Sequence, residues 1–157
     1  MEEKIIIRKA KEEDAKKIIE FTKLVRIESI FLGSHPDDTM PDLETEKKML
    51  KESDNNKFWL VAILNDELIG MVTFNRNIKI KRKHRASFGM SVKKDYWGKK
   101  IGSRLMERML EYAQNLDGLE KIELEVFSDN ERGVALYKKY GFEEEGRIKK
   151  AFLVDGE

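Results

Sequence analysis

The sequence predicts a single mixed α/β domain of the α+β kind, with one central, mostly antiparallel sheet flanked by about four helices. Its 157 residues are about one domain's worth of chain. Short apolar runs and longer segments of helical spacing follow the order strand, two helices, three strands, helix, strand, helix, strand. No repeat, low-complexity tract or linker divides the chain, so we expect residues 1–157 to form one domain.

The first part of the chain supplies one strand and two helices. KIIIRKA (4–10) is typical of a short strand, and the acidic triplet at 12–14 suits the positive N-terminal end of a helix. The Gly- and Pro-containing segment 31–41 predicts a loop. Pro41 suits the first turn of a second helix, which we expect to end near Ser53.

Three strands are predicted next. FWLVAIL (58–64) and LIGMVTF (68–74) are apolar runs too short for helices, and the turn between them indicates a hairpin. RASFGMSV (85–92) is expected to be a third partner in that sheet. The basic run NIKIKRKHR (77–85) alternates with isoleucines, as an exposed hairpin strand does. No aromatic residue is interleaved for base stacking, so we expect no nucleic-acid partner.

The last part of the chain alternates helices with strands. A helix beginning near Ile101 is followed by a strand at 121–127, a helix at 130–140 and strand material at 141–154. Such alternation implies a crossover and a parallel strand pair. Ligands of these sheets bind beyond the carboxyl ends of strands. The third strand of the meander leads directly into residues 95–102, which therefore lie at such an end.

Composition excludes several classes of protein. Lys plus Arg number 31 against 30 Asp plus Glu, a net charge of +1 that argues against a nucleic-acid or membrane surface as the main partner. The chain has no cysteine, and His35 and His84 make a poor metal constellation, so we expect no metal. No signal-peptide core is present, and no apolar run approaches the roughly 20 residues that span a bilayer. We expect a cytoplasmic protein.

The segment VKKDYWGKKIGSRL (92–105) places glycines and lysines before an amphipathic helix. The first turn of a helix has unpaired N–H groups, and Gly98 and Gly102 let the backbone approach a ligand closely. A pyrophosphate fits these features, although a simple turn before a helix is the alternative. The spacing is not that of a Walker loop, and it lacks the third glycine of a Rossmann fingerprint.

The same segment, followed by LEVFSDNERGVALYKKYGF (124–142), strongly resembles the Gcn5-related N-acetyltransferase superfamily. The first segment corresponds to the family's acetyl-coenzyme A loop, and the second to its Asn-x6-Tyr-x3-Gly-Phe signature. Asn130, Tyr137, Gly141 and Phe142 match that signature in type and spacing. The resemblance covers nearly the whole chain. It implies an acetyl-coenzyme A-dependent N-acetyltransferase whose sheet is splayed between the fourth and fifth strands.

The resemblance also assigns the coenzyme-binding residues. Backbone groups at the end of the strand before the loop would bond the pantetheine arm, and amides of the loop would hold the pyrophosphate. The residues so assigned are Met90, Ser91, Val92, Trp97, Gly98, Lys99, Lys100, Ile101, Gly102, Ser103 and Asn130.

Two positions depart from the family's loop. Trp97 stands where the family has Gln or Arg, and packing as a core or lid residue is the alternative for it. Lys100 stands where the family usually has its first Gly. An ordinary right-handed conformation at Lys100 would be tolerated, whereas a left-handed one would cost roughly 1 kcal/mol. Its ammonium group is a candidate for an additional phosphate ion pair.

Acetylation of an amine requires a base for the ammonium and an acid for the departing thiolate. The resemblance makes Tyr137 the acid. The alternative is that Tyr137 only packs its helix against the sheet, a role for which Tyr140 is the better candidate. Glu125 has the spacing of the base in ribosomal-protein alanine acetyltransferases, and alternation places it on the same strand face as Glu123. A solvated strand face, with a water chain or a free amine in place of the base, is the alternative for Glu125.

The expected acceptor is a primary amine of a small molecule or of a protein N-terminus, attacking directly in a ternary complex. We expect its pocket between the helix-to-helix loop and the tip of the meander. In that region His35, Asp37 and Asp38, with Glu28 upstream, would attract a cation or simply be solvated. The alternative function is a non-catalytic acyl-coenzyme A-binding regulatory module.

The sequence ends at Glu157, directly after Asp155 and Gly156, which suggest a hairpin turn without a returning strand. Either further chain follows, or another subunit completes the sheet. The second explanation predicts a homodimer.

Overall fold

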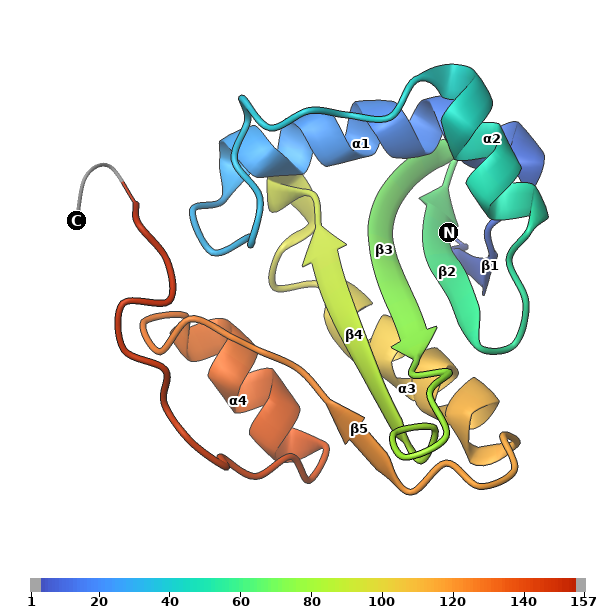
Figure 1. The fold of residues 1–157 in the computed structure, drawn as a ribbon. Helices are drawn as coiled ribbons and strands as arrows, with labels where there is room; N and C mark the ends of the chain where they lie inside the picture. Colours follow the sequence, from blue (N-terminus) through green and yellow to red (C-terminus); the bar gives the residue numbers. More distant parts are fainter. Residues whose placement is uncertain (1–3, 155–157) are drawn as a thin grey trace.

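A computed structural model describes residues 4–154 of the chain (Figure 1). In chain order the elements are β1 (Ile6–Lys9), the 3₁₀ turn η1 (Glu12–Asp14), α1 (Ala15–Glu28), α2 (Leu43–Lys51), β2 (Lys57–Leu64), β3 (Glu67–Arg76), β4 (Arg85–Val92), the 3₁₀ turn η2 (Lys94–Tyr96), α3 (Ile101–Gln114), β5 (Lys121–Glu123) and α4 (Glu131–Lys139).

The five strands form one sheet in the order β1-β2-β3-β4-β5. The first three junctions are antiparallel and the last, between β4 and β5, is parallel. α1 and α2 cover one face of the sheet, and α3 lies on the opposite face (Figure 1). This arrangement confirms the predicted class, a mixed and mostly antiparallel sheet flanked by four helices.

The two faces of the sheet bury two separate apolar cores. β2 is buried on both faces, so its successive side chains point alternately into each core. Trp59 and Val61 pack on the α1/α2 face with residues such as Phe21. Phe58 packs on the other face, in the same core as Leu105 of α3. β2 is therefore the strand around which both layers are assembled.

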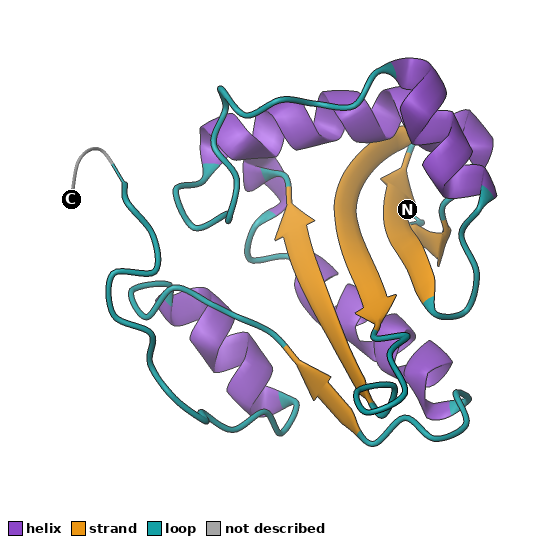
Figure 2. Ribbon diagram, viewed as in Figure 1, coloured by secondary structure: helices purple, strands orange, loops and turns teal. Residues whose placement is uncertain are grey.

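β4 and β5 pair over only three residues each, from Arg85 to Ser87 and from Lys121 to Glu123, and then diverge (Figure 2). The His84 carbonyl accepts from Lys121 N–H at 3.0 Å, and the Arg85 carbonyl accepts from Asn77 N–H at 3.0 Å, on the opposite side. Backbone N–H and carbonyl groups alternate in direction along a strand. Those of the even-numbered residues of β4 therefore point toward β5. Within residues 4–154, no strand pairs with that side of β4 beyond Ser87. The predicted splay is confirmed.

Three predicted strands were wrong in extent or in kind. The predicted strand 121–127 ends at Glu123, because β4 has left it there and no described strand lies on its other side. Residues 141–154 form no strand, since this highly charged stretch has no described partner. The basic run 77–85 forms turns up to His84, not a strand.

The second helix also differs from its prediction at both ends. It begins at Leu43, two residues beyond Pro41, because Asp42 caps it by accepting the Thr45 N–H at 2.7 Å. It ends at Lys51 rather than near Ser53. The predicted turn at residues 155–156 lies outside the described part of the chain.

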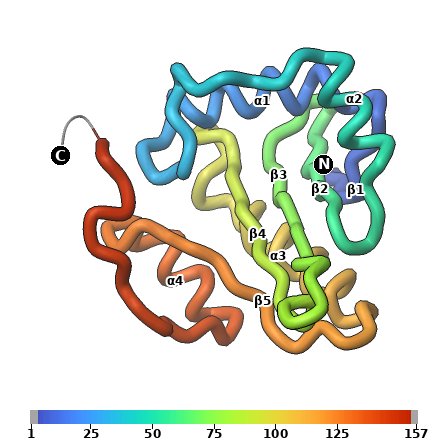
Figure 3. The backbone as a smooth tube through the Cα atoms, in the orientation of Figure 1, coloured from blue at the N-terminus to red at the C-terminus, as the bar shows by residue number. Residues whose placement is uncertain are grey.

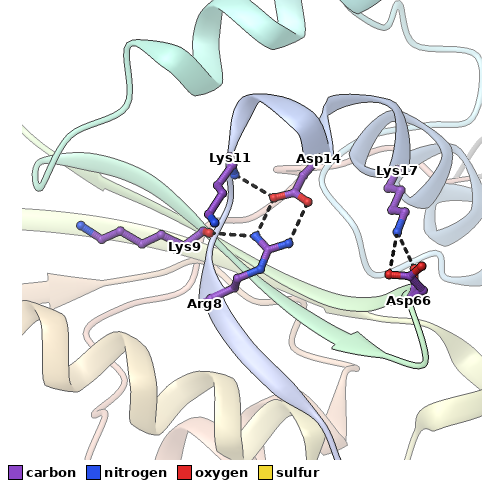
Figure 4. A network of polar contacts seen from close by, with 6 residues as sticks. All are labelled: Arg8, Lys9, Lys11, Asp14, Lys17 and Asp66. Carbon is purple, nitrogen blue, oxygen red and sulfur yellow. Dashed lines mark hydrogen bonds and ion pairs between the residues drawn. The ribbon is translucent and has the colours of Figure 1, made fainter.

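An ion pair with a buried carboxylate and a partly exposed arginine joins β1 to the start of α1 (Figure 4). Arg8 donates to both carboxylate oxygens of Asp14, at 2.7 and 2.9 Å, and the Lys11 N–H donates to the same group at 2.7 Å. Asp14 is only 6% exposed. Burial raises its pKa, but the hydrogen bonds from Arg8 and Lys11 lower it by more, so the pKa of this carboxyl lies below its ordinary value of 3.8.

We expect Asp14→Asn to lower the free energy of unfolding by about 1–3 kcal/mol at neutral pH, because Arg8 loses its charged acceptor. Folding lowers the pKa of Asp14, so its contribution is complete above 3.8 and is lost as pH falls through the lowered pKa. The difference between variant and wild type should therefore shrink in acid. Urea unfolding at a series of pH values measures it.

Asp66→Asn is the matched control. Asp66 also lies near a cation, with 3.7 Å between its carboxylate and Lys17 Nζ, but its side chain is fully exposed (Figure 4). This variant should unfold like the wild type. Equal urea midpoints for the two variants at neutral pH would show that the pair of Arg8 and Asp14 does not stabilise the fold.

Candidate functional site

The loop between η2 and α3 presents backbone N–H groups at the start of a helix. Gly98 and Lys100 both have positive φ, at 77° and 64°, and Lys100 is the N-cap residue of α3. The Arg104 N–H donates to the Lys100 carbonyl at 3.1 Å, so the N–H groups of residues 101–103 precede the first helical hydrogen bond. Such a group of forward-pointing donors suits an anion.

Lys100 adopts the left-handed conformation, which costs a non-glycine residue roughly 1 kcal/mol. The sequence left both conformations open, and the structure has the strained one. The family's glycine at this position is therefore explained by the backbone. In this chain a lysine adopts the same turn at some cost in stability.

The Trp97 side chain connects the loop to β4 and α4 through two contacts. Its indole Nε1 donates to the Val92 carbonyl at the end of β4 at 2.8 Å, and the Arg132 guanidinium of α4 lies 4.8 Å from the ring centroid. The Trp97 N–H donates to the Lys94 carbonyl at 3.1 Å. The amide of Trp97 and the carbonyl of Val92 thus already have partners. The packing alternative describes Trp97 better than a role as an amide donor.

Gly102 lies where α3, α4 and β4 come together. A Cβ atom at this position would lie 3.3 Å from Leu136 of α4 and 3.5 Å from Met90 of β4. Glycine therefore permits the close approach of these three elements. The structure brings together two predicted coenzyme-binding residues, Met90 and Gly102, beside the diverging side of β4.

The signature residues of the second motif begin and end α4. The Asn130 side chain caps the helix by accepting the Gly133 N–H at 3.1 Å, and a Cβ on Gly133 would lie only 2.6 Å from Asn130 Nδ2. At the other end Gly141 has a φ of 89°, and the Phe142 N–H donates to the Tyr137 carbonyl at 3.0 Å. Part of the motif therefore shapes the helix.

Tyr137 lies on the α3/α4 side of the sheet. Its ring meets Phe88 of β4 edge to face at 5.7 Å and lies 6.1 Å from Phe142, between ring centroids. Burial raises the pKa of Tyr137 above its ordinary value of 10.0, so the phenol keeps its proton at neutral pH. The Tyr140 hydroxyl instead donates to Glu107 of α3 at 2.9 Å. Both Tyr137 and Tyr140 pack against the core on this face, and Tyr137 contacts β4 directly, so packing is not confined to Tyr140.

A cleft of about 490 Å³ opens on the other face of the sheet, along the diverging strands. Paired residues share a face, and Trp59 pairs with Thr73, which pairs with Gly89, so this side of β4 belongs to the α1/α2 face. The lining includes Phe31, Ser87, Glu123, Glu125, Phe127 and Phe152. Glu125 and Tyr137 therefore lie on opposite faces of the splayed strands.

The carboxylates of this cleft differ in their partners. Glu123 accepts from Arg85 of β4 at 2.6 and 3.1 Å, and Lys121 lies 3.9 Å from it. Glu125 is exposed to the cleft, and it forms no ion pair with any residue in the range 4–154. Glu125 is thus the carboxylate whose charge is not offset by a neighbouring cation. The alternative of a strand face neutralised by lysines describes Glu123 better than Glu125.

The charged loop residues expected at the acceptor pocket do not line the cleft. Glu28 accepts the Lys94 N–H at 3.1 Å, and Asp38 accepts the His35 N–H at 2.7 Å, so both stabilise loops. The loop contributes Phe31 instead. The sequence analysis missed the lining residues Phe31, Arg85, Ser87, Phe127 and Phe152. For Phe31, the available signal was an aromatic residue in a Gly- and Pro-containing loop; Phe127 and Phe152 stood in segments that were predicted as strands.

Neither a metal site nor a membrane span is found in the described part of the chain. Residues 4–154 contain no group of three or more His, Asp or Glu side chains arranged to hold a metal ion. None of the helices described is long and apolar enough to cross a membrane.

Comparison with known proteins agrees with this architecture. The L-amino acid N-acetyltransferase AaaT of Escherichia coli (strain K12) is 39% identical over 98 residues, 62% of this chain and 60% of that protein. The spermidine N(1)-acetyltransferase of Vibrio cholerae serotype O1 is 32% identical over 114 residues, 72% of this chain and 64% of that protein. The chain thus spans less than two thirds of the length of these relatives.

A solved structure and a family description extend the comparison. The crystal structure of an acetyltransferase of the GNAT family from Streptococcus pneumoniae superposes with a TM-score of 0.87 at 30% identity, covering 91% of this chain and 87% of that one. The sequence model described as "Acetyltransferase (GNAT) family" matches residues 21–142. That match covers most of the sheet, the loop before α3 and the whole of α4, and this chain therefore belongs to the acetyltransferase (GNAT) family.

Proposed function

We propose that this protein is an acetyl-coenzyme A-dependent N-acetyltransferase that acts on a primary amine, of a small molecule or of a protein N-terminus, in a ternary complex. The observation that carries the proposal is the open side of β4 from Phe88 to Val92, which lies between the start of α3 and Tyr137. The names of the relatives, acetyltransferases of L-amino acids and of spermidine, support an amine acceptor.

The residues present fit the coenzyme. Phe88 and Met90 of β4 turn N–H and carbonyl groups toward the opening, where the amides of a pantetheine arm would satisfy them, whereas the Val92 carbonyl is already bonded to Trp97. The N–H groups of residues 101–103 would hold the pyrophosphate. Lys99 and Lys100 are exposed beside them, whereas Lys93 is paired with Glu67 at 2.9 Å. When bound, acetyl-coenzyme A supplies an activated acetyl thioester.

The transfer breaks a C–S bond and forms a C–N bond. The nitrogen gives up two protons, one from the ammonium before attack and one as the amide forms, and one proton is delivered to the departing thiolate, so one proton is released to solvent overall. Tyr137 is the donor we assign for the proton that the thiolate receives. Its raised pKa keeps the phenol protonated, and its position against Phe88 places it beside the open part of β4. At neutral pH the phenol is therefore in the protonated form that a general acid requires.

Glu125 is the group we assign as acceptor of the ammonium proton, directly or through a water molecule. It lies in the cleft on the face opposite Tyr137, so the acceptor and the coenzyme would reach the splay from different faces. The carboxylate is not neutralised by a cation within residues 4–154, which suits it to attract an ammonium. Attraction and deprotonation by one carboxylate are compatible.

The test of the proposal is an acetylation screen of an amine panel, with product mass analysis and a parallel assay of free coenzyme A. Acetylated amine together with thiol release is the expected result. Stabilisation by acetyl-coenzyme A without any acetylated product would instead identify a non-catalytic acyl-coenzyme A-binding module. A protein that acetyl-coenzyme A does not stabilise would contradict both readings.

We expect Lys100→Gly to raise the free energy of unfolding by about 0.5–1 kcal/mol, because glycine adopts the left-handed conformation without strain. Coenzyme affinity at high salt should be retained, because the backbone amides remain. Any weakening at low salt measures the phosphate attraction of the lysine side chain. Thermal unfolding with and without acetyl-coenzyme A measures both quantities.

Lys150→Gly is the matched control, since Lys150 also has a positive φ, of 55°, but lies in the C-terminal segment. It should gain stability without any change in coenzyme affinity. If Lys100→Gly abolished stabilisation by the coenzyme at every salt concentration, the side chain rather than the amides would be the binding group.

Tyr137→Phe keeps the ring that packs on Phe88 and deletes only the hydroxyl. Folding and coenzyme binding should survive, and turnover should fall about 100-fold or more, the usual worth of general acid catalysis. Steady-state kinetics measure the loss. Tyr140→Phe, which removes the hydrogen bond to Glu107, is the control and should keep its turnover. Wild-type turnover in Tyr137→Phe would refute the acid assignment.

Glu125→Gln keeps the shape of the side chain and removes its charge. If Glu125 accepts the proton, directly or through water, the loss of kcat/KM should shrink as pH rises, because the free amine becomes abundant. A pH profile from neutral upward measures this. Glu143→Gln, at an exposed position outside the cleft, is the control. A loss that is the same at every pH would mean that Glu125 positions the acceptor and is not the base.

A further inference from the structure

Three phenylalanines from distant parts of the chain form one wall of the cleft. Phe31 follows α1, Phe127 follows β5, and Phe152 belongs to the C-terminal segment, which runs from α4 toward the loop after α1 (Figure 3). The ring centroids of Phe31 and Phe127 lie 5.9 Å apart, and those of Phe127 and Phe152 lie 4.5 Å apart. We refer to these three residues as the phenylalanine wall.

The phenylalanine wall belongs to neither of the two apolar cores. Phe152 is 43% exposed, and Phe31 and Phe127 are only half-buried. Gly33 lies next to Phe152, since a Cβ atom at Gly33 would make an ordinary contact with this ring at 3.8 Å. This apolar surface lines a concave space. Covering it with another apolar group removes it from water and is therefore favourable for binding.

The same cleft contains one negative charge that no neighbouring cation among the described residues offsets. Arg85 and Glu123 neutralise each other, and Glu125 remains. The cleft therefore offers one carboxylate beside an aromatic surface. This arrangement suits an acceptor with a single cationic nitrogen and one large apolar group. A polyamine would have to bring its further cations next to the phenylalanines, where no second carboxylate lines the wall.

We infer that the acceptor is a primary amine carrying an aromatic ring or an apolar group of similar size, with its ring on the phenylalanine wall and its nitrogen at Glu125. The inference rests on the proposed N-acetyltransferase function. The cleft volume of about 490 Å³ is within the range of small-molecule sites. An arylalkylamine and an aromatic amino acid share this chemistry, and the experiment compares them.

The test compares kcat/KM for 2-phenylethylamine, L-phenylalanine, ethanolamine and spermidine. At least one of the two aromatic amines should exceed both polar amines by about tenfold or more, the discrimination expected for a large apolar group in an apolar site. Saturation-transfer NMR with 2-phenylethylamine and the protein in the presence of coenzyme A gives a readout independent of turnover. Its ring protons should receive more saturation than the protons next to the nitrogen.

Variants of the phenylalanine wall test which residues cause the preference. Phe31→Ala and Phe152→Ala should lower the ratio of kcat/KM for the preferred aromatic amine to that for ethanolamine by about tenfold. Phe127→Leu retains apolar bulk and should reduce the preference even if an alanine variant fails to fold. Leu153→Ala is the matched control, because Leu153 is 78% exposed, follows Phe152 directly and does not line the cleft.

The outcomes separate this inference from the function on which it rests. Acetylation of ethanolamine or spermidine as efficiently as of both aromatic amines would overturn the inference and leave the N-acetyltransferase function intact. An unchanged preference in all three wall variants would also overturn it. If acetyl-coenzyme A stabilised the protein but no amine were acetylated, the proposed function itself would fail, and the inference with it.

Discussion

The rest of the site depends on one constraint, the hydrogen-bonding requirement of β4. Past Ser87 this strand is paired on the β3 side only, because β5 has turned away. Backbone groups of alternate residues thus face an opening instead of a strand, and such groups need a partner. The loop before α3 closes one end of the opening, where Trp97 bonds the Val92 carbonyl. α4 approaches it through Tyr137, and the cleft lies along its other face.

The two faces of the sheet at this opening carry different kinds of functional groups. On the α3/α4 side are a protonated phenol, apolar rings and the amide donors of a helix start. On the α1/α2 side are a carboxylate, an ion pair and the phenylalanine wall. In the proposed reaction, the group that loses a proton and the group that gains one would thus lie in different surroundings. Within β4, the alternation of successive side chains decides which residue lies on which face.

Local patterns predicted the periodic elements well. β4 was predicted at 85–92, where it is found, and α3 begins at Ile101 as expected. Strand content near β5 was overestimated, because a run of alternating residues becomes a strand only when a neighbour pairs with it. The motif residues Asn130 and Tyr137 were found from their spacing. The phenylalanine wall was not, because its members are far apart in sequence and meet only in the folded chain.

The three-residue pairing of β4 with β5 has a consequence for how the molecule opens. It joins Arg85 to Lys121 across a long stretch of chain that includes all of α3, whereas the other strand pairs are antiparallel and longer. A short edge strand with few partners is among the first parts of a fold to open. Amide hydrogens of β5 should therefore exchange with solvent sooner than those of β2. A molecule bound between the diverging strands would stabilise this edge and slow the exchange. The exchange rate of the β5 amides would therefore report whether the site is occupied.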